Sequence, residues 1–529
     1  MNTMKGTGAL IRLILRRDRI VLPIWIVLPA LLALGIESSF AQLYHTPALL
    51  QAFANEVAGN PAEVALLGPI YAPTLAGITV WRLSFMGAIL VALANLFTVT
   101  RHTRTEEEAG RRELLGSAVV GRHAALSAVL IVTGAANLLI ALLVAGALIG
   151  IGFPVAGSCA LGLSLAAVGW TFAALAAVTG QLAESAGSAN GMAGGLLGLC
   201  YLLRTIGDMG LSWLSWLSPL GWMRFIRPFA AERWWIFALF IGLVAVLSIL
   251  AYRLAARRDL GAGFLPPRLG SATAAPGLSN PFALAWRLQR GTLLVWIISF
   301  AIVGGAFGYV ASTVAAQLST NPQMMQLFAH MGHNVDPGEG FFTLSLEIFG
   351  EVAAAYAILA TLRLRTEETS GRAEPVLANA VGRITWAISH LLFAILGPAL
   401  VLLAFGLTAG LTYGISQGTV ESTLPRILYA TLAYLPAVWV LAGLAVVLFG
   451  LLPRLVAYVS WALLVACLLL DLGGELQQVN QAILNLSPFI HIPKLLVGDS
   501  SLLSLLWLSL IAAAFGAIGL LGFRRRAIG

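Results

Sequence analysis

The chain has 529 residues, of which 59% are hydrophobic and 10% charged, and its mean hydropathy is +0.90. Soluble domains carry about 25% charged residues, so this composition excludes an ordinary soluble protein and places the chain in a membrane. The formal net charge of +8 does not indicate nucleic-acid binding, because the basic residues form short clusters between long apolar runs instead of one basic face.

Twelve runs along the chain are long and apolar enough to cross a bilayer, which requires about 20 residues each. They lie near residues 20–38, 79–100, 125–150, 160–181, 189–207 and 235–254, and then near 291–313, 343–362, 385–410, 427–449, 455–472 and 502–523. Before the first run, apolar residues alternate with arginines over residues 8–19, which is typical of a helix in the inner headgroup layer. Residues 282–290 are expected to form the corresponding helix of the second half. The prediction is an all-α polytopic membrane protein with twelve transmembrane helices.

The loops between these runs indicate orientation and domain organisation. Most of the 31 Lys and Arg residues fall in segments that are cytoplasmic if the N-terminus is inside, so both termini are expected in the cytoplasm. Residues 259–281 contain four prolines among Gly, Ser and Ala, which is linker composition. We therefore predict two six-helix halves, 1–258 and 282–529, joined by a cytoplasmic linker at 259–281. The apolar external segments 211–235 and 474–500 are expected to form helices at the outer leaflet.

A charged segment is duplicated. Arg104–Arg122 recurs without a gap as Arg365–Arg383, with ten of nineteen positions identical. Because each half contributes an even number of spans, both copies lie on the cytoplasmic side and the repeat is parallel. Thr105 and Thr366 are expected to cap short helices. In-register recurrence of Glu, Gly and Arg favours a docking element for a cytoplasmic partner over a merely solvated loop.

The chain has no nucleotide-binding motif of its own, because no Gly-Lys pair occurs. The in-plane helix, the charged helix after span 2 and the apolar external segment between spans 5 and 6 resemble the type-2 exporter permeases of ATP-binding-cassette (ABC) transporters. The duplicated form, with E-E-x-x-G-R in both halves, resembles the actinobacterial permeases described as exporters of polyketide antibiotics, the tetronasin-resistance type.

This resemblance implies a transport subunit of the bacterial cell membrane that is not itself an enzyme and binds no cofactor. Two copies of a separate ABC ATPase would hold ATP and Mg, and the permease would contact membrane lipids and export a hydrophobic drug, antibiotic or lipid. The ATPase would dock on the segments after spans 2 and 8. The matching residues are Thr105, Glu106, Glu107, Gly110, Arg111 and Glu113 in the first copy and Thr366, Glu367, Glu368, Gly371, Arg372 and Glu374 in the second.

Two carboxylates interrupt the eighth span. Glu347 and Glu351 lie one turn apart, and an ionised carboxylate in a span costs at least about 2.5 kcal/mol, so each should face protein or water. One hypothesis pairs Glu347 with Arg82 of the second span, which would join the two halves. Another places Glu351 on the export path, where it would attract cationic substrates, and a third has a protonated glutamate bonded between helices.

Other classes of protein fit less well. A secondary transporter of the major-facilitator type also has six plus six spans, but the opening glycine and the aspartate of its loop motif are missing. A membrane enzyme is disfavoured because no cluster of His, Asp or Glu points into the bilayer. An external group of soft ligands would suit copper, but an amphipathic helix explains it, and we expect no metal site. Its members are Met324, Met325, His330, Met331, His333 and Asp336.

Overall fold

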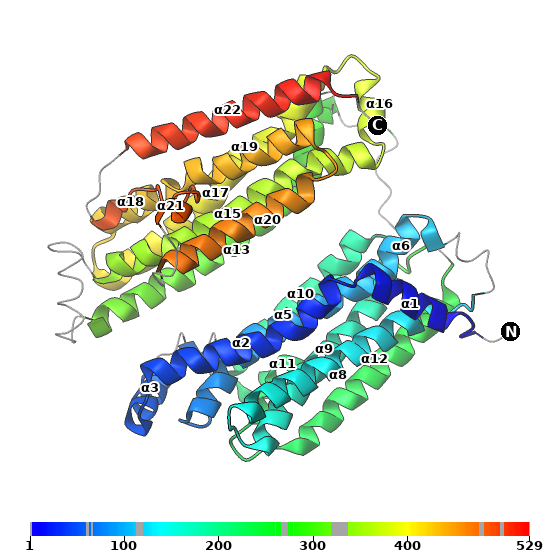
Figure 1. Cartoon of the computed structure of the whole chain (residues 1–529), viewed down its shortest axis with the longest axis vertical. Helices are drawn as coiled ribbons and strands as arrows, with labels where there is room; N and C mark the ends of the chain where they lie inside the picture. The colour runs from blue at the N-terminus through cyan, green and yellow to red at the C-terminus, as the bar shows by residue number, and fades with distance from the viewer. Residues whose placement is uncertain are drawn as a thin grey trace. The chain divides into compact units, whose positions relative to one another are not determined.

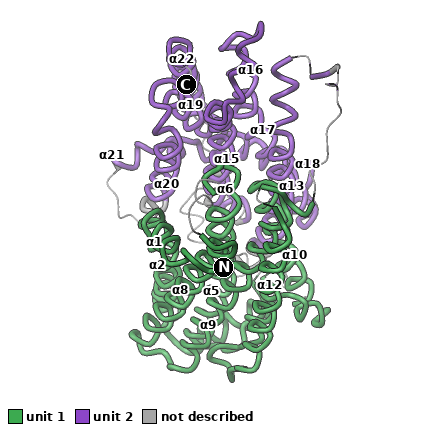
Figure 2. The backbone as a smooth tube through the Cα atoms, turned by 90° about the vertical axis from the view of Figure 1, so that its right-hand side faces the viewer, with its two compact units in different colours: residues 1–270 green, residues 271–529 purple. Residues whose placement is uncertain are grey.

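The fold consists of helices in two compact units. The computed structural model describes residues 3–59, 63–64, 67–112, 120–208, 210–259, 261–265, 273, 276–278, 280–318, 337–475, 481–497 and 502–527. Every element in these ranges is a helix (Figure 1), so the all-α prediction is confirmed. The units are Met1–Gly270 and Ser271–Gly529 (green and purple in Figure 2), and each has its own hydrophobic core. Their boundary falls within the residues predicted as the linker, 259–281.

The first unit is organised around α9, which packs against α5, α8, α10 and α12. Gly162 and Gly169 of α9 let it approach α8 closely, because an added Cβ would collide with Ala141 and Asn137, a form of small-residue packing common between membrane helices. The helices are α1 (Thr7–Arg17), α2 (Val21–Leu43), α3 (Pro47–Gly59), α5 (Leu75–His102), α6 (Arg104–Glu108), α8 (Ala124–Gly150), α9 (Val155–Leu182), α10 (Ala186–Asp208), α11 (Pro219–Phe225) and α12 (Phe237–Arg257), with 3-10 turns η1 (Ser212–Leu217) and η2 (Trp234–Ile236).

In the second unit, α17 packs along α13 and α18, and α19 packs along α22. The helices are α13 (Pro281–Leu318), α15 (Pro337–Thr369), α16 (Ala373–Leu377), α17 (Arg383–Gln417), α18 (Val420–Leu432), α19 (Leu435–Leu451), α20 (Val456–Glu475), α21 (Gln481–Leu484) and α22 (Leu503–Arg525), with 3-10 turns η3 (Pro276–Leu278) and η4 (Leu495–Val497).

Two helix boundaries differ from the sequence prediction. The tenth span, Val420–Leu451, is interrupted by a turn between α18 and α19 just before Pro436, whose ring removes a backbone donor. Residues 282–290 are not a separate in-plane helix but the first turns of α13, which continues into the seventh span. In the first unit, by contrast, α1 ends at Arg17, before α2 begins at Val21.

Ten helices of the described part of the chain are long and apolar enough to cross a membrane. The polytopic prediction is therefore confirmed, whereas the count of twelve stays a prediction. The two predicted spans that fall short are α10, which is rich in glycine and carries Arg204 and Asp208, and α20, whose apolar part, Val456–Asp471, is short.

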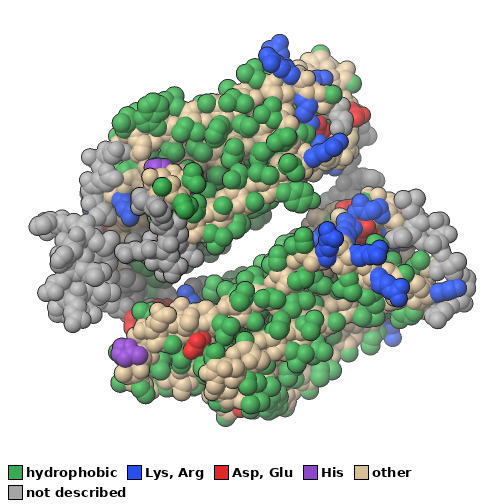
Figure 3. Space-filling model, viewed as in Figure 1, with side chains coloured by type: hydrophobic (Ala, Val, Ile, Leu, Met, Phe, Trp, Pro, Cys, Tyr) green, Lys and Arg blue, Asp and Glu red, His purple; other side chains and the backbone are tan. Residues whose placement is uncertain are grey.

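The surface of each unit is polarised along its length. Hydrophobic side chains cover most of the visible surface, and most of the visible Lys and Arg side chains gather at one end of each unit (Figure 3). By the positive-inside rule this is the cytoplasmic end. The external segment 211–235 forms the short elements η1, α11 and η2, with Trp213 and Trp235 largely exposed, as tryptophans at a membrane interface commonly are.

Candidate functional site

The duplicated segment begins at the cytoplasmic end of a membrane helix in both units: it follows α5 after a turn at Thr103 in the first, and it forms the last turn of α15 in the second. Thr105 lies inside α6, and its hydroxyl donates to the carbonyl of Thr100 at 3.4 Å. Thr366 lies inside α15 and donates to the carbonyl of Leu362 at 3.2 Å. The predicted caps at Thr105 and Thr366 are therefore wrong, because α6 begins at Arg104, one residue before Thr105, and α15 continues through Thr366.

The first glutamate of each copy closes a turn. Glu106 accepts from Nε and Nη2 of Arg111, five residues later, at 2.8 and 2.9 Å. Glu367 accepts from the same two atoms of Arg372 at 2.8 and 3.3 Å. This pairing is the same in both units, so it accounts for the recurrence of these four residues.

The glycine of each copy makes that turn possible. Gly110 and Gly371 have φ values of +68° and +70°, in the left-handed region that glycine adopts at little cost. Both follow the end of a helix, α6 and α15 respectively, at the position where such a glycine commonly terminates a helix.

The second glutamate of the first copy holds the end of the last helix of its unit. The Glu107 side chain is only 2% exposed and accepts from Arg104 at 2.7 Å and from Arg258 at 2.8 Å to each of its oxygens. Arg112 also pairs with it. Because Arg258 directly follows α12, these contacts fasten the cytoplasmic end of α12 to the segment after α5.

The second unit repeats this arrangement. The Glu368 side chain is also 2% exposed and accepts from Arg365 at 3.2 Å and from Nη2 of Arg526 at 2.9 Å. It also forms an ion pair with Nη1 of Arg526 at 2.8 Å. Arg526 directly follows α22, so it occupies the place that Arg258 has after α12.

The last arginine of each copy completes the contact. Arg122 donates to the backbone carbonyl of Arg258 at 3.0 Å, and Arg383 donates to that of Arg526 at 2.8 Å. We call each set a cytoplasmic clamp: Arg104, Glu107, Arg122 and Arg258 in the first unit, and Arg365, Glu368, Arg383 and Arg526 in the second. In the sequence, Arg258 and Arg526 counted only among the basic residues that indicate orientation. Both directly follow the final span of their half, and this shared position was the one sign of a shared role.

The clamps change which predicted docking residues a partner can reach. Glu107 and Glu368 are buried and bonded within their own units, so the recurrence of the motif has an internal structural reason. Arg111, Arg372 and Glu374 are exposed, whereas Glu113 lies outside the described residues.

The first unit also anchors its in-plane helix to this region. Arg17 of α1 pairs with Glu106. Asp18, which the sequence analysis did not single out, is buried and lies 2.6 Å from Nε2 of His102 and 3.1 Å from Arg101. These contacts tie α1 to the cytoplasmic end of α5.

The intramembrane carboxylates of α15 lie near a third one. Glu351 is 3% exposed. It and Asp471 of α20 are both within electrostatic range of Cys467, and Glu347 and Asp471 are both within range of Tyr434. The structure thus brings three acidic residues to one region of the second unit, and Asp471 was missed although it interrupts an apolar run as the glutamates do.

Burial raises the pKa of the Glu63 carboxyl in the first unit. Arg82, which belongs to the same unit, opposes this rise with its positive charge. Its hypothetical partner Glu347 belongs to the second unit, so their pairing stays a prediction.

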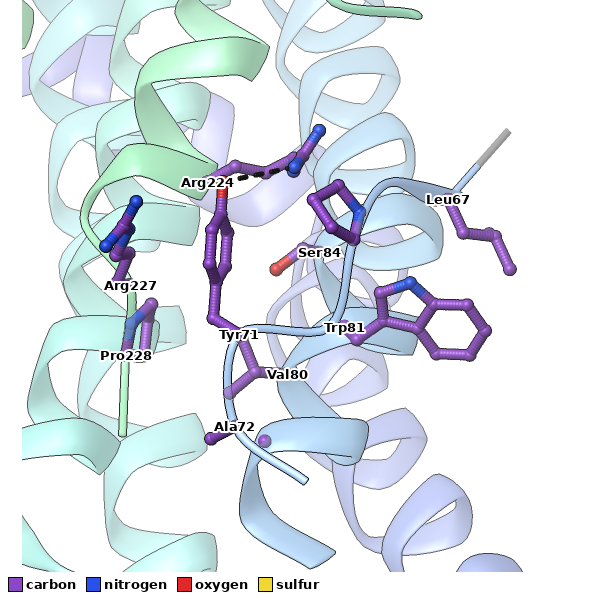
Figure 4. Close-up of a pocket in the computed structure, with 11 residues that line it drawn as sticks. Leu67, Tyr71, Ala72, Val80, Trp81, Ser84, Arg224, Arg227 and Pro228 are labelled. Atoms are coloured by element: carbon purple, nitrogen blue, oxygen red, sulfur yellow. Dashed lines mark hydrogen bonds between the residues drawn. The ribbon is translucent and has the colours of Figure 1, made fainter. Parts of the chain in front are cut away.

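Buried arginines also hold the external side of the first unit together. Arg224 of α11 donates to the Tyr71 hydroxyl at 3.2 Å (Figure 4) and pairs with Asp208 of α10. Its burial lowers the pKa of the guanidinium to about 10. The adjoining cavity of about 20 Å³ is far smaller than ligand pockets, which measure about 300–1,000 Å³, so this cluster is a structural tie.

No group of three or more His, Cys, Asp or Glu side chains that could hold a metal ion occurs in the ranges that the structure describes. The external methionine and histidine group, Met324 to Asp336, lies outside those ranges.

The apolar helices and the two matching clamps define a multi-pass membrane protein built from two related units. Residues 278–524 match the family described as "Multidrug efflux system permease Rv1217c, C-terminal domain". Over 522 residues the chain is 43% identical to the "Multidrug efflux system permease protein Rv1217c" of Mycobacterium tuberculosis (strain ATCC 25618 / H37Rv), which covers 98% of this chain and 95% of the relative. The chain therefore belongs to this family of multidrug efflux permeases, and not to the major-facilitator class.

Proposed function

We propose that this chain is the membrane-spanning subunit of an ABC exporter that moves hydrophobic drugs out of the cell. The relative in Mycobacterium tuberculosis is a multidrug efflux permease, which supports the substrate class and the direction. The resemblance to polyketide-antibiotic permeases adds hydrophobic antibiotics to the expected substrates, beside other drugs and lipids. ATP and Mg bind to two copies of a separate ATPase, and this chain binds no cofactor.

The observation that carries the proposal is that the same clamp occurs once in each unit. Two copies of one ATPase need two equivalent attachment points, and a duplicated cytoplasmic element supplies them. Because each clamp joins the segment after span 2 or 8 to the end of the last helix of its unit, a force on that segment reaches two membrane helices at once.

The ATPase is proposed to contact only part of the duplicated segment. Buried Glu107 and Glu368 hold the clamps, and the exposed residues of the segment contact the ATPase. In the second unit these are Arg372 and Glu374, the latter in the first turn of α16.

The test is to co-express the permease with a cassette ATPase and to measure co-purification and ATP-dependent drug export in proteoliposomes. Reversing the charge with Glu374→Arg should reduce co-purification severalfold and leave the permease folded. The matched control is Glu421→Arg, an exposed glutamate in the first turn of α18, outside the duplicated segment.

An unchanged complex with Glu374→Arg would remove α16 from the docking surface. Drug export by the permease alone, driven by a proton gradient without ATP, would overturn the proposal in favour of a secondary transporter.

A further inference from the structure

An apolar groove runs between α17, α19 and α22 of the second unit. Gly450 and Gly519 let α19 and α22 approach so closely that an added Cβ on Gly450 would collide with the backbone of Gly519. Gly410 instead brings α17 against Leu424 of α18, and α17 touches α19 only sparsely. The wedge that remains between α17 and the α19–α22 pair has a volume of about 540 Å³, within the range of about 300–1,000 Å³ of ligand sites.

The polar groups of this groove are already satisfied. Trp439 donates its indole N–H to the carbonyl of Ile395 at 3.0 Å, and Ser509 donates its hydroxyl to Leu505 at 2.8 Å. The other lining residues are Ala, Gly, Val, Leu and Ile. A polar ligand would lose its hydrogen bonds to water here without replacement, which costs free energy, so the groove favours a hydrocarbon chain.

Along α22 the groove has about the length of one membrane leaflet. Along α22 it extends from Ser509 to Leu520, which is roughly 16 Å at 1.5 Å per residue. The hydrocarbon core of a bilayer is about 30 Å thick, so this length matches half of it. The lining residues of α17 lie at 388–395, within the first third of that helix and next to its basic end at Arg383, which places this side of the groove toward the inner leaflet.

Positive charge continues the groove at its cytoplasmic end. Arg524 lies four residues after Leu520 and hence on the same face of α22, and it is exposed. Arg525 beside it is exposed as well, at the end of the unit where basic side chains gather (Figure 3). Basic residues at this level attract anionic lipid headgroups.

We propose that this groove binds an acyl chain of an anionic phospholipid of the inner leaflet, with Arg524 facing the phosphate. The inference goes beyond the efflux function and requires only that the second unit lies in a membrane. Its test uses the permease without any ATPase, so its failure would leave the proposed function untouched.

The experiment measures lipid binding to the purified full-length permease by native mass spectrometry, with phosphatidylglycerol and phosphatidylcholine of identical acyl chains. Gly516 lines the groove, and a Cβ added there meets no atom within 4 Å, so Gly516→Phe should direct its ring into the groove and remove one tightly bound lipid. Gly516→Ala should retain it. Gly242→Phe on α12, where an added Cβ is equally unobstructed, is the control and should bind lipid as the unmodified chain does.

Arg524→Gln tests the headgroup. It should reduce the preference for phosphatidylglycerol over phosphatidylcholine about fivefold, which is the effect of one basic residue near an anionic surface. Thermal unfolding of each variant shows whether it is folded.

Unchanged lipid binding by a folded Gly516→Phe variant would overturn the proposal, as would equal binding of the two lipids to the unmodified chain. If the unmodified chain carried no tightly bound lipid but bound an exported drug, and Gly516→Phe abolished that drug binding, the groove would belong to the substrate and the lipid proposal would be overturned as well.

Discussion

Gly110 and Gly371 illustrate how single residues fix the cytoplasmic turns. Both have positive φ values, and an added Cβ at either position meets no atom within 4 Å. The requirement for glycine is therefore conformational and not steric, since other L-residues pay to enter the left-handed region.

Gly371→Ala should destabilise the permease by a net amount of about 1 kcal/mol, because the left-handed cost exceeds the gain from a stiffer unfolded chain. Gly371→Asn should lose less, since asparagine tolerates this region. The measurement is the apparent melting temperature in detergent.

The control is Gly134→Ala within α8, where a Cβ is also unobstructed and where alanine should stabilise by about 0.5–1 kcal/mol. If alanine raised the melting temperature equally at both positions, the conformational argument for Gly371 would be incorrect.

At the scale of elements, the clamps join helices that are distant in the sequence. Glu107 reaches the arginine that follows α12, 151 residues away, and Glu368 reaches the one that follows α22, 158 residues away. The two clamps are not equally redundant. Glu107 has three arginine partners, whereas Glu368 has Arg365 and Arg526.

Arg526→Gln should therefore destabilise more than Arg258→Gln. Removing one partner of a buried ion pair costs about 3–5 kcal/mol when the other charge is left unpaired, and both variants should fall below this value because other arginines remain. Thermal unfolding gives the ranking, and Arg525→Gln, at an exposed neighbour, should have little effect.

The double variant Arg526→Gln, Glu368→Gln should be more stable than the sum of the two single effects predicts, since residues in one ion-pair network are coupled. Strict additivity would show that Arg526 and Glu368 do not interact as described.

At the scale of the whole molecule, each unit contains its own core and its own clamp. The first part of the linker is fastened to the first unit, because Arg104 donates to the backbone carbonyls of Gly261 and Ala262 at 2.9 and 3.0 Å. The covalent connection needed between the units thus begins after these residues, and not directly after α12.

A chain cut between Gly270 and Ser271 should still assemble when both pieces are co-expressed, because the cut lies between the two compact units. Co-purification of the pieces and drug export in cells provide the measurement. A cut between Arg258 and Asp259 should be less stable, since the backbone that holds Arg104 would belong to the other piece. Equal stability of the two split forms would contradict the role of that backbone.

The sequence by itself determined the all-α polytopic class, because a hydrocarbon layer demands long apolar runs and a helix satisfies its own backbone there. It also determined the duplication, since ten matching residues in one register are visible without any structure. Helix boundaries were less accessible: the break before Pro436 and the continuation of α13 depend on packing as well as on local preference.

The partners of the charged residues were decided only by the tertiary structure. The sequence suggested that Glu107 and Glu368 face an ATPase, and the fold instead buries them against arginines at the ends of α12 and α22. The neighbours of Asp18 and Asp471 are likewise distant in the sequence and are brought close only by the fold. The physical reason is that burial and ion pairing depend on which distant helix ends meet, and hydropathy along the chain carries no information about those contacts.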